Sequence, residues 1–334
     1  MARLRWRCLF WLFSLSTSAS AAETPSFIFP VDCNYGVDCF IQNYVDNDPT
    51  PAYRDYQCHH QTYNGHTGTD IRLINLPQMA SGVAVLAAAD GEVIAIRNSV
   101  ADVYLDPEKH AQLEAIGLGN AVILQHSDSW LTLYGHLKKD SLKVSKGDWV
   151  QQGQVLGDIG LSGLTAFPHV HFQVKHQDQT IDPFTGTSIS ANCGNTENTL
   201  WHPSLLKQLT YFEGSLLDHG FSDQRPPDYQ AIESGTFNQG ADKHSPHLFF
   251  WVRLIGLSEG DQITLQLIAP DGQSLKNHTF PALTRSKAQQ FYYIGMKNPV
   301  GQPGSWQGQL TLERSGLPVM EKTFSYIVED AAGR

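Results

Sequence analysis

The sequence predicts a mainly β protein, in which an antiparallel-sheet domain is followed by a small β-sandwich of immunoglobulin-like style. Two observations carry this prediction. Residues 82–174 form short apolar runs separated by glycine-containing turns, and residues beyond 240 alternate apolar and polar side chains. A length of 334 residues also favours two domains. We expect boundaries at 1–22 (a signal peptide), 23–195 (first domain), 196–232 (linker) and 233–334 (sandwich).

In the first domain, four segments are predicted to form strands. They read GVAVLAAADGEVIAIRN, GNAVILQHSDSWLTLYGHL, KGDWVQQGQVLGDIG and HVHFQVKH, with DG, KGD and GD marking tight turns. Residues 106–117, DPEKHAQLEAIG, differ from these segments. An aspartate at the cap, a proline at the first position and a closing glycine predict a short helix that interrupts two strands.

After Cys193 the composition changes. Residues 194–240 are polar and include RPPD, which is typical of a connecting segment. Strands are then expected in HLFFWVRLIGL, DQITLQLIAPDGQSL, QQFYYIGM and SWQGQLTLERSGLPVMEKTFSYIV. Trp201, Trp251 and Trp306 are expected in the core of this sandwich, because large aromatic side chains dominate such cores.

The first residues have the order of a secretory signal peptide. Arg3, Arg5 and Arg7 precede an apolar run that ends near Leu15, and small residues follow up to Ala22. That run is far shorter than the roughly 20 residues of a spanning helix, so we expect cleavage rather than a membrane anchor. The mature protein is therefore predicted to be periplasmic or secreted, without a membrane span.

Export would place the cysteines in a compartment where disulfides form. Without Cys8, the chain keeps Cys33, Cys39, Cys58 and Cys193, an even set in an oxidising compartment. Three pairings are possible; we favour Cys33 with Cys39 and Cys58 with Cys193, the second tying the ends of one domain together. A zinc cluster of cysteines is the alternative, but the sequence contains no C-x-x-C pair.

The charge of the chain argues against some partners. The net charge is −10, and loss of the three N-terminal arginines would make it −13. An acidic protein without a basic cluster is a poor candidate for binding nucleic acid or an anionic membrane surface.

Two histidine motifs are the candidates for chemistry. NGHTGTDIR places His66 four residues before Asp70, and FPHVHFQV places His169 and His171 two apart. Each pattern is weak alone, since His136 and Asp140 repeat the first spacing. However, Gly65 and Gly68 favour a bent, closely packed backbone around His66, and residues i and i+2 of a strand lie on one face.

Together these motifs supply the donors of a zinc site. Two imidazoles and one carboxylate suit zinc, and three protein ligands leave a fourth position open for water, as in catalytic sites. A further histidine near the metal could act on that water or on a developing oxyanion. No H-E-x-x-H motif occurs, so a helix-borne glutamate base is not expected. The alternative interpretation is that these histidines are exposed to solvent or form ordinary hydrogen bonds in the core.

HTGTD, LYGHL and KGDWVQQGQVLGDIGLSGLTAFPHVHF, taken in order, resemble the M23 (LytM/lysostaphin-type) zinc metallopeptidases over roughly residues 60–185. The resemblance implies a LytM-type antiparallel sheet and one zinc ion bound by His66, Asp70 and His171. It also implies that His136 and His169 are catalytic and that peptide cross-links of bacterial peptidoglycan are the substrate. Which of the two histidines moves which proton stays open.

Two departures from the family bear on this reading. Gln173 stands where the family often has a glutamate, and the insertion at residues 99–118 is larger than in compact members. The alternatives are a non-catalytic envelope scaffold or activator with the same fold, and a secreted zinc protease acting on proteins. The presence of all five functional positions favours an enzyme over the scaffold.

The first prediction concerns export and oxidation. Purified exported protein should begin near Ala22 or Glu23 and contain no reactive thiol, because the signal peptide carries Cys8 and both remaining cysteine pairs are oxidised. N-terminal mass analysis and thiol titration in denaturant measure this, with reduced protein as the control. Reactive thiols in the non-reduced exported protein would contradict the disulfide assignment.

Overall fold

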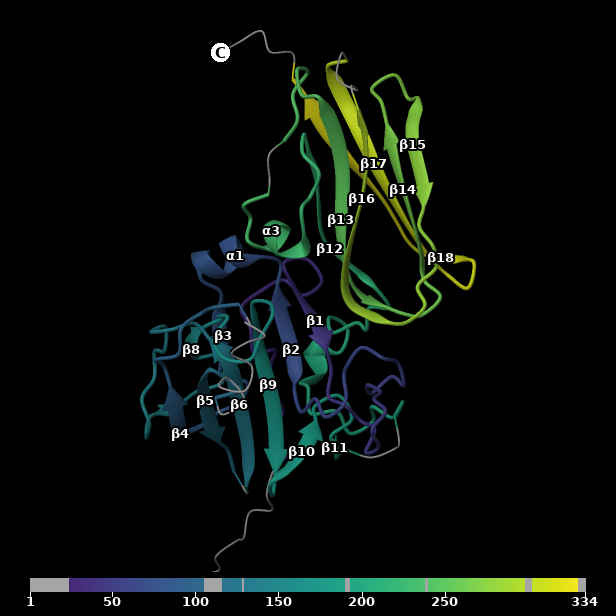
Figure 1. Ribbon diagram of the computed structural model, residues 1–334. Helices are drawn as coiled ribbons and strands as arrows, with labels where there is room; N and C mark the ends of the chain where they lie inside the picture. Colours follow the sequence, from purple (N-terminus) through teal and green to yellow (C-terminus); the bar gives the residue numbers. More distant parts are fainter. Residues whose placement is uncertain are drawn as a thin grey trace, which may run out of the picture.

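The computed structural model describes residues 24–104, 116–127, 129–189, 193–237, 240–297 and 302–329. It consists of two β units, one above the other in Figure 1. The signal peptide expected at residues 1–22 and most of the helix expected at 106–117 lie outside the described residues. In the part of the chain that is described, we find no helix with the length and apolar character needed to cross a membrane.

The first unit is built on a nine-stranded antiparallel sheet. Its main path runs in the order β1, β2, β9, β6, β5, β4, β7, and β10 and β11 extend it from β9. The strands are β1 (Cys39–Asn43), β2 (Thr69–Leu73), β4 (Gly91–Arg97), β5 (Asn120–Gln125), β6 (Trp130–Leu137), β7 (Trp149–Val150), β9 (His169–His176), β10 (Gln179–Asp182) and β11 (Thr187–Ser188). The short strands β3 (Ala84–Leu86) and β8 (Val155–Asp158) pair separately, and the helix α1 (Leu76–Ser81) follows β2.

Strand β9 lies at the centre of this sheet and is buried along most of its length. Val170, Phe172 and Val174 are fully buried in the apolar core. Because side chains alternate between the two faces of a strand, His169 and His171 lie together on the opposite face. The alternation in HVHFQV therefore separates the core of the domain from its candidate site.

The second unit contains two antiparallel sheets. One has the order β12 (Ser215–Ser222), β13 (His247–Leu257), β16 (Lys287–Lys297), and the other β15 (Ser274–Thr279), β14 (Gln262–Ile268), β17 (Gly304–Arg314), β18 (Leu317–Val328). A single core joins them, with Phe250 from one sheet and Trp306 from the other fully buried. The mainly β, antiparallel prediction is thus confirmed. The immunoglobulin-like character of this sandwich stays a prediction.

Two expectations differ from the structure in detail. The predicted linker, residues 196–232, contains a 3-10 turn, η2 (Pro203–Leu205), the strand β12 and most of the helix α3 (Tyr229–Glu233). The polar composition of this segment hid a strand that pairs with β13 along its length. Trp201 is buried in the core of the first unit rather than in the sandwich, because its backbone pairs with Phe27 near the start of that domain. Trp251 is buried in a separate small cluster with Ile232 and Phe237, and only Trp306 lies in the sandwich core.

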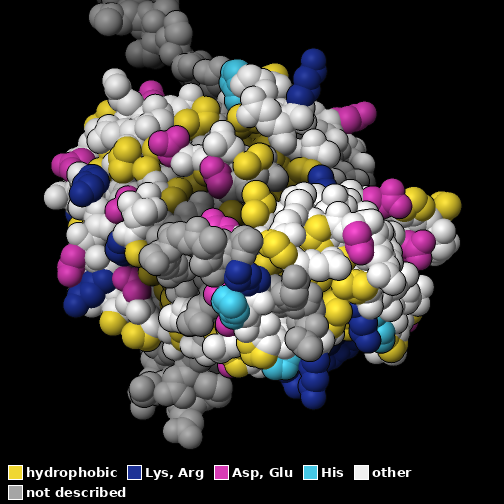
Figure 2. All heavy atoms as spheres, turned by 90° about the horizontal axis from the view of Figure 1, so that it is seen from above, with side chains coloured by type: hydrophobic (Ala, Val, Ile, Leu, Met, Phe, Trp, Pro, Cys, Tyr) yellow, Lys and Arg dark blue, Asp and Glu magenta, His cyan; other side chains and the backbone are white. Residues whose placement is uncertain are grey.

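The two disulfides pair as favoured. Cys33 bonds to Cys39 across a separation of six residues, and Cys58 bonds to Cys193 across 135 residues. The second bridge connects the loop that precedes His66 with the end of the first domain. On the face seen in Figure 2, acidic and basic side chains are interspersed among scattered apolar ones.

The second prediction compares these disulfides. The chain-entropy account assigns about 5 kcal/mol to closing a loop of 135 residues and about 2 kcal/mol to closing one of six. Replacing Cys58 and Cys193 by serine should therefore destabilise the first unit more than replacing Cys33 and Cys39. Hydrogen exchange of peptides from β6 and β9 measures the local free energy of opening. An equal or larger loss from the short bridge would show that the loop-closure argument does not apply.

Candidate metal centre

Strand pairing brings the two histidine motifs together. Asp70 lies opposite His171 where β2 pairs with β9, and opposite Asn43 where β1 pairs with β2. On the far side of β9, His171 lies opposite Gly135 of β6, the residue before His136. Directly opposed residues of neighbouring strands present their side chains to each other. One row across four strands thus collects residues from four distant parts of the chain.

Three donor atoms converge in this row. Oδ1 of Asp70 lies 3.1 Å from Nε2 of His66 and 2.9 Å from Nδ1 of His171. Those two ring nitrogens are 3.3 Å apart. The three residues are 2%, 3% and 6% exposed. Two imidazole nitrogens and a carboxylate oxygen at one point are the donor set that zinc takes in proteins, so the residues fit this ion.

Neighbouring groups fix which atoms face the centre. Nδ1 of His66 donates to the carbonyl of Tyr44 at 2.7 Å, which leaves Nε2 as the free donor atom. The side-chain amide of Asn43 donates to Oδ2 of Asp70 at 2.9 Å and leaves Oδ1 toward the histidines. Such outer contacts orient metal ligands and hold their tautomers. Nε2 of His171 is buried and has no hydrogen-bond partner within the described residues.

His136 and His169 lie beside the three donors. Their ring centroids are 4.5 Å apart, and Nε2 of His169 is 3.5 Å from Oδ1 of Asp70. Nδ1 of His169 donates to the carbonyl of Phe167 at 2.9 Å, and Nδ1 of His136 donates to the carbonyl of Ser162 at 2.8 Å. Both histidines therefore keep Nε2 for chemistry.

His136 has a backbone conformation that is uncommon for a residue with a side chain. Its φ is 59°, in the left-handed region. Its N–H donates to the carbonyl of Leu118 at 2.7 Å, and its own carbonyl accepts from the N–H of Gly160 at 3.0 Å. Strained residues of this kind persist where their surroundings determine them, and they cluster at functional sites.

The proton affinities of these groups are shifted by burial and by each other. Burial opposes ionisation of Asp70, but the neighbouring His66 and His169 outweigh it and hold the pKa of this carboxyl well below its usual range. Burial, reinforced by His169 and His171, holds the pKa of His136 well below its usual range. Burial also lowers the pKa of His171. His136 is therefore neutral near pH 7, and since its proton is on Nδ1, its Nε2 carries a free lone pair.

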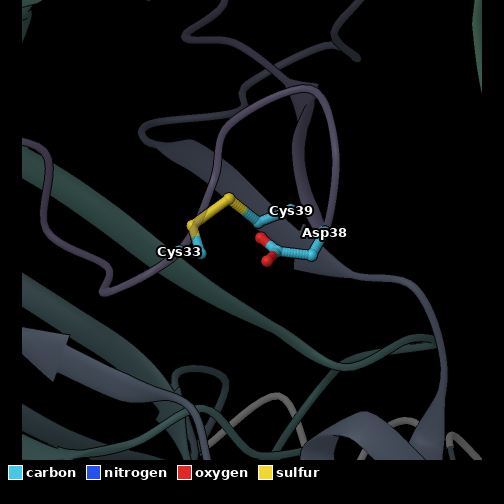
Figure 3. Close-up of side chains that lie close together, drawn as sticks. All are labelled: Cys33, Asp38 and Cys39. Atoms are coloured by element: carbon cyan, nitrogen blue, oxygen red, sulfur yellow. A yellow bond between two sulfur atoms is a disulfide. The ribbon is translucent and has the colours of Figure 1, made fainter.

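A second group of possible metal donors, Cys33, Asp38 and Cys39, lies near the start of β1. Figure 3 shows that the two sulfur atoms are bonded to each other. A disulfide provides no thiolate, so this group does not form a metal site of the cysteine type. The carboxylate of Asp38 instead accepts from the backbone N–H of Asn34 at 2.7 Å.

All five sequence-predicted residues meet at one place, and their roles stay proposals. The sequence alone did not point to Asn43, the carbonyl of Tyr44 or the carbonyl of Ser162. No short motif could have found these partners, because two are backbone groups and the third lies 27 residues before Asp70. Gln173, which replaces the glutamate of many family members, donates to Thr180 at 3.1 Å.

The antiparallel sheet and its buried His–Asp–His set define the class, a β-sheet domain with a candidate metal centre. Residues 64–183 match the sequence model of a family described as Peptidase family M23. All five predicted residues lie within that match.

Three curated relatives illustrate the range of named roles. The cell division protein DipM of Caulobacter vibrioides is 32% identical over 33% of this chain and 16% of its own length. The murein hydrolase activator NlpD of Escherichia coli is 27% identical over 31% of this chain and 23% of its own length. The DD-carboxypeptidase/endopeptidase Mpg of Neisseria meningitidis serogroup B is 31% identical over 40% and 25%. The matched segment spans a quarter or less of each relative.

Among solved structures, the catalytic domain of the prophage-encoded M23 protein EnpA from Enterococcus faecalis matches with a TM-score of 0.28 and 24% identity. The match covers 42% of this chain and 88% of that one.

The third prediction concerns Gly68, which packs under His171. A Cβ added at this position would lie 2.5 Å from Nε2 of His171 and 2.9 Å from the carbonyl of Phe172. Gly68→Ala should therefore displace the His171 ring and lower zinc affinity by about 10- to 100-fold, the scale seen when a ligand loses its support. Competition with a chromogenic chelator measures the affinity.

Gly65→Asn is the matched control for this change. Gly65 has φ +78° and open space around its Cβ position, and asparagine tolerates the left-handed region. This variant should bind zinc as the unchanged protein does. Equal zinc affinity in the Gly68→Ala variant would contradict the packing argument.

Proposed function

We propose that this protein is an exported zinc metalloendopeptidase that cleaves peptide cross-links of bacterial peptidoglycan. The observation that carries the proposal is the convergence of the His66, Asp70 and His171 donor atoms next to two histidines that are held at Nδ1 by backbone carbonyls. A purely structural metal site is closed by four protein ligands, whereas three ligands leave a position for a reacting molecule.

In this proposal His66 through Nε2, Asp70 through Oδ1 and His171 through Nδ1 hold the zinc ion. The ion supplies Lewis-acid activation of water and polarisation of the scissile carbonyl. His136 is buried and neutral, and its Nδ1 is committed to Ser162, so its Nε2 can take up a proton. The proton taken from the water is the one that the leaving amine needs. His136 can pass it on itself, or His169, whose Nδ1–H donates to the Phe167 carbonyl, can deliver it from Nε2 once that atom has received it. In that protonated form Nε2 of His169 can also donate to the developing oxyanion.

The substrate class rests on the relatives. Mpg is named as a DD-carboxypeptidase/endopeptidase, and ShyB of Vibrio cholerae, 30% identical over 35% of this chain, is named as a peptidoglycan DD-endopeptidase. Both names describe endopeptidases, and the name of ShyB specifies peptidoglycan. A second candidate function is that of a non-catalytic activator of another enzyme. Its support is the similarity to NlpD, which is named as a murein hydrolase activator.

The fourth prediction separates metal ligands from proton-transfer groups. His66→Ala, Asp70→Ala and His171→Ala should each lose zinc and activity together, because each removes a coordination bond. His136→Ala and His169→Ala should keep near-stoichiometric zinc and lose about 100-fold or more in kcat, the scale of a lost acid–base group. Metal analysis beside kinetics on each variant decides this. If His169→Ala lost zinc while His171→Ala kept it, the assignment within the H-x-H pair would be reversed.

Digestion of purified sacculi tests the proposal directly. The zinc-loaded protein should release peptide fragments whose masses correspond to opened cross-links, and the metal-stripped protein and the Asp70→Ala variant should release none. Release only when a separate cell-wall hydrolase is added would favour the activator. Cleavage of an unrelated unfolded protein with sacculi left intact would favour a general protease.

A further inference from the structure

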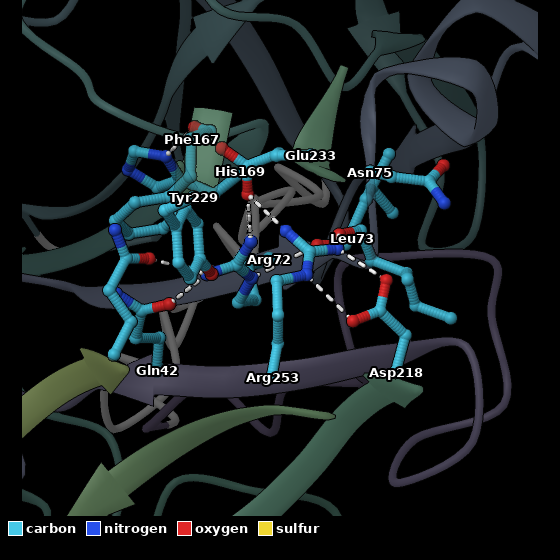
Figure 4. Close-up of polar contacts among 12 residues, drawn as sticks. Gln42, Arg72, Leu73, Asn75, Phe167, His169, Asp218, Tyr229, Glu233 and Arg253 are labelled. Atoms are coloured by element: carbon cyan, nitrogen blue, oxygen red, sulfur yellow. Dashed lines mark hydrogen bonds and ion pairs between the residues drawn. The ribbon is translucent and has the colours of Figure 1, made fainter. Parts of the chain in front are cut away.

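Three buried charged side chains and one half-buried one meet where the sandwich contacts the first unit. They are Arg72 of β2, Glu233 of α3, Arg253 of β13 and Asp218 of β12 (Figure 4). Arg72 and Arg253 are 0% exposed and Glu233 is 1% exposed. Buried charges are tolerated when they are paired with good geometry, so these contacts fix how the two units meet.

Groups from the second unit hold the Arg72 guanidinium in place. Nη2 of Arg72 donates to Oε1 of Glu233, and Nη1 donates to Oε1 of Gln289 at 3.0 Å and to the Tyr229 hydroxyl at 3.4 Å. Within its own unit, Arg72 donates to Gln42 and, through Nε, to the carbonyl of Leu73 at 3.0 Å. The position of the guanidinium thus depends on residues at least 157 positions away in the sequence.

Arg72 also faces the candidate metal centre. It lies directly opposite His169 where β2 pairs with β9. Its guanidinium carbon is 4.7 Å from the centroid of the Phe167 ring, a cation–π distance. The Phe167 ring is in turn 4.5 Å from the His169 ring, and the Phe167 carbonyl accepts the proton on Nδ1 of His169. Phe167 therefore lies between a buried cation and the imidazole.

We propose that Glu233 is a positioning residue for His169 and acts through Arg72 and Phe167, so that the sandwich unit is part of the peptidase site. This inference rests on the proposed function, since it assigns His169 a role in that reaction. Glu233 fixes the guanidinium, the guanidinium fixes the Phe167 ring, and the Phe167 ring and carbonyl fix the orientation of His169. A small displacement of a catalytic group lowers the rate without removing the metal.

Asp218 provides a matched control within the same cluster. Its two carboxylate oxygens accept from Nε and Nη2 of Arg253, both at 2.6 Å. Arg253 donates onward to the carbonyl of Ile74 at 2.8 Å and, through Nη1, more distantly to Oε1 of Glu233 at 3.4 Å. Asp218 is thus one residue further from Arg72 than Glu233 is. Asp218→Asn and Glu233→Gln both change a carboxylate to an amide at this interface, but only the second touches the partner of Phe167.

The fifth prediction uses the full-length, zinc-loaded protein. Glu233→Gln should retain zinc and lower kcat by about 10-fold or more, with KM within about twofold, because orientation of His169 and not substrate binding is disturbed. Asp218→Asn should leave kcat within about twofold, and Glu233→Asp, which keeps the charge, should recover part of the loss. Equal kcat in Glu233→Gln and Asp218→Asn would overturn the inference and reduce Glu233 to a structural role.

A spectroscopic measurement separates this inference from the proposed function. In protein labelled with nitrogen-15 at histidine, the ring signals of His169, assigned with His169→Ala, should move in Glu233→Gln and stay in place in Asp218→Asn. If the unchanged protein is inactive on sacculi but these signals move, the peptidase proposal fails and the positioning inference stands. If the protein is active and the signals stay in place, the positioning inference fails alone.

Phe167→Leu tests the same connection if Glu233→Gln does not fold. This change keeps the Arg72–Glu233 pair and removes the ring between the guanidinium and the imidazole. The His169 signals should again move, and kcat should fall with zinc retained. Unchanged signals and an unchanged kcat in this variant would overturn the inference on their own.

Discussion

The pairing of β2 with β9 is the interaction on which the rest of the site depends. It sets Asp70 opposite His171 and Arg72 opposite His169, so alternate residues on one face of β2 lie beside alternate residues on the same face of β9. Register is a strict constraint, because a slip of one residue sends every side chain to the other face. Val170, which lies between these histidines, and Phe172, which follows them, are fully buried in the core and hold the register. The same hydrophobic packing that stabilises the sheet thus brings the donor atoms together.

The third donor comes from a loop, and the loop is stabilised by hydrogen bonds and a disulfide. Asp46 accepts from the N–H of Gly65 at 2.9 Å, and its own N–H donates to the carbonyl of His66 at 2.8 Å. The carbonyl of Tyr44 orients the ring of His66. The disulfide between Cys58 and Cys193 ties the segment before this loop to the end of the first domain. His66 is thereby placed as firmly as the donors on the strands, although no strand carries it.

The buried arginines connect the second unit to this sheet. Phe40, Leu217 and Ile255 form an apolar cluster between the units, and the charged groups around Arg72 and Arg253 lie beside it. Unpaired buried charges are strongly destabilising, so each arginine needs a carboxylate from the second unit. A separable binding module would not need such contacts. The polar stretch that follows Cys193 is therefore part of the architecture, through β12 and α3.

What the sequence by itself determined is local. Alternation and glycine turns predicted most strands, and the even set of cysteines predicted the disulfides. Histidine spacing pointed to His66, Asp70, His169 and His171, and the resemblance to the M23 family added His136. Most of these signals are short patterns of neighbouring residues. Only the tertiary structure decided that Asn43 supports Asp70, that carbonyls of Tyr44 and Ser162 orient two histidines, and that Glu233 holds Arg72 behind Phe167. These contacts join residues far apart in the chain or use backbone groups common to every residue. They follow from strand order and packing, and no short pattern of side chains records them.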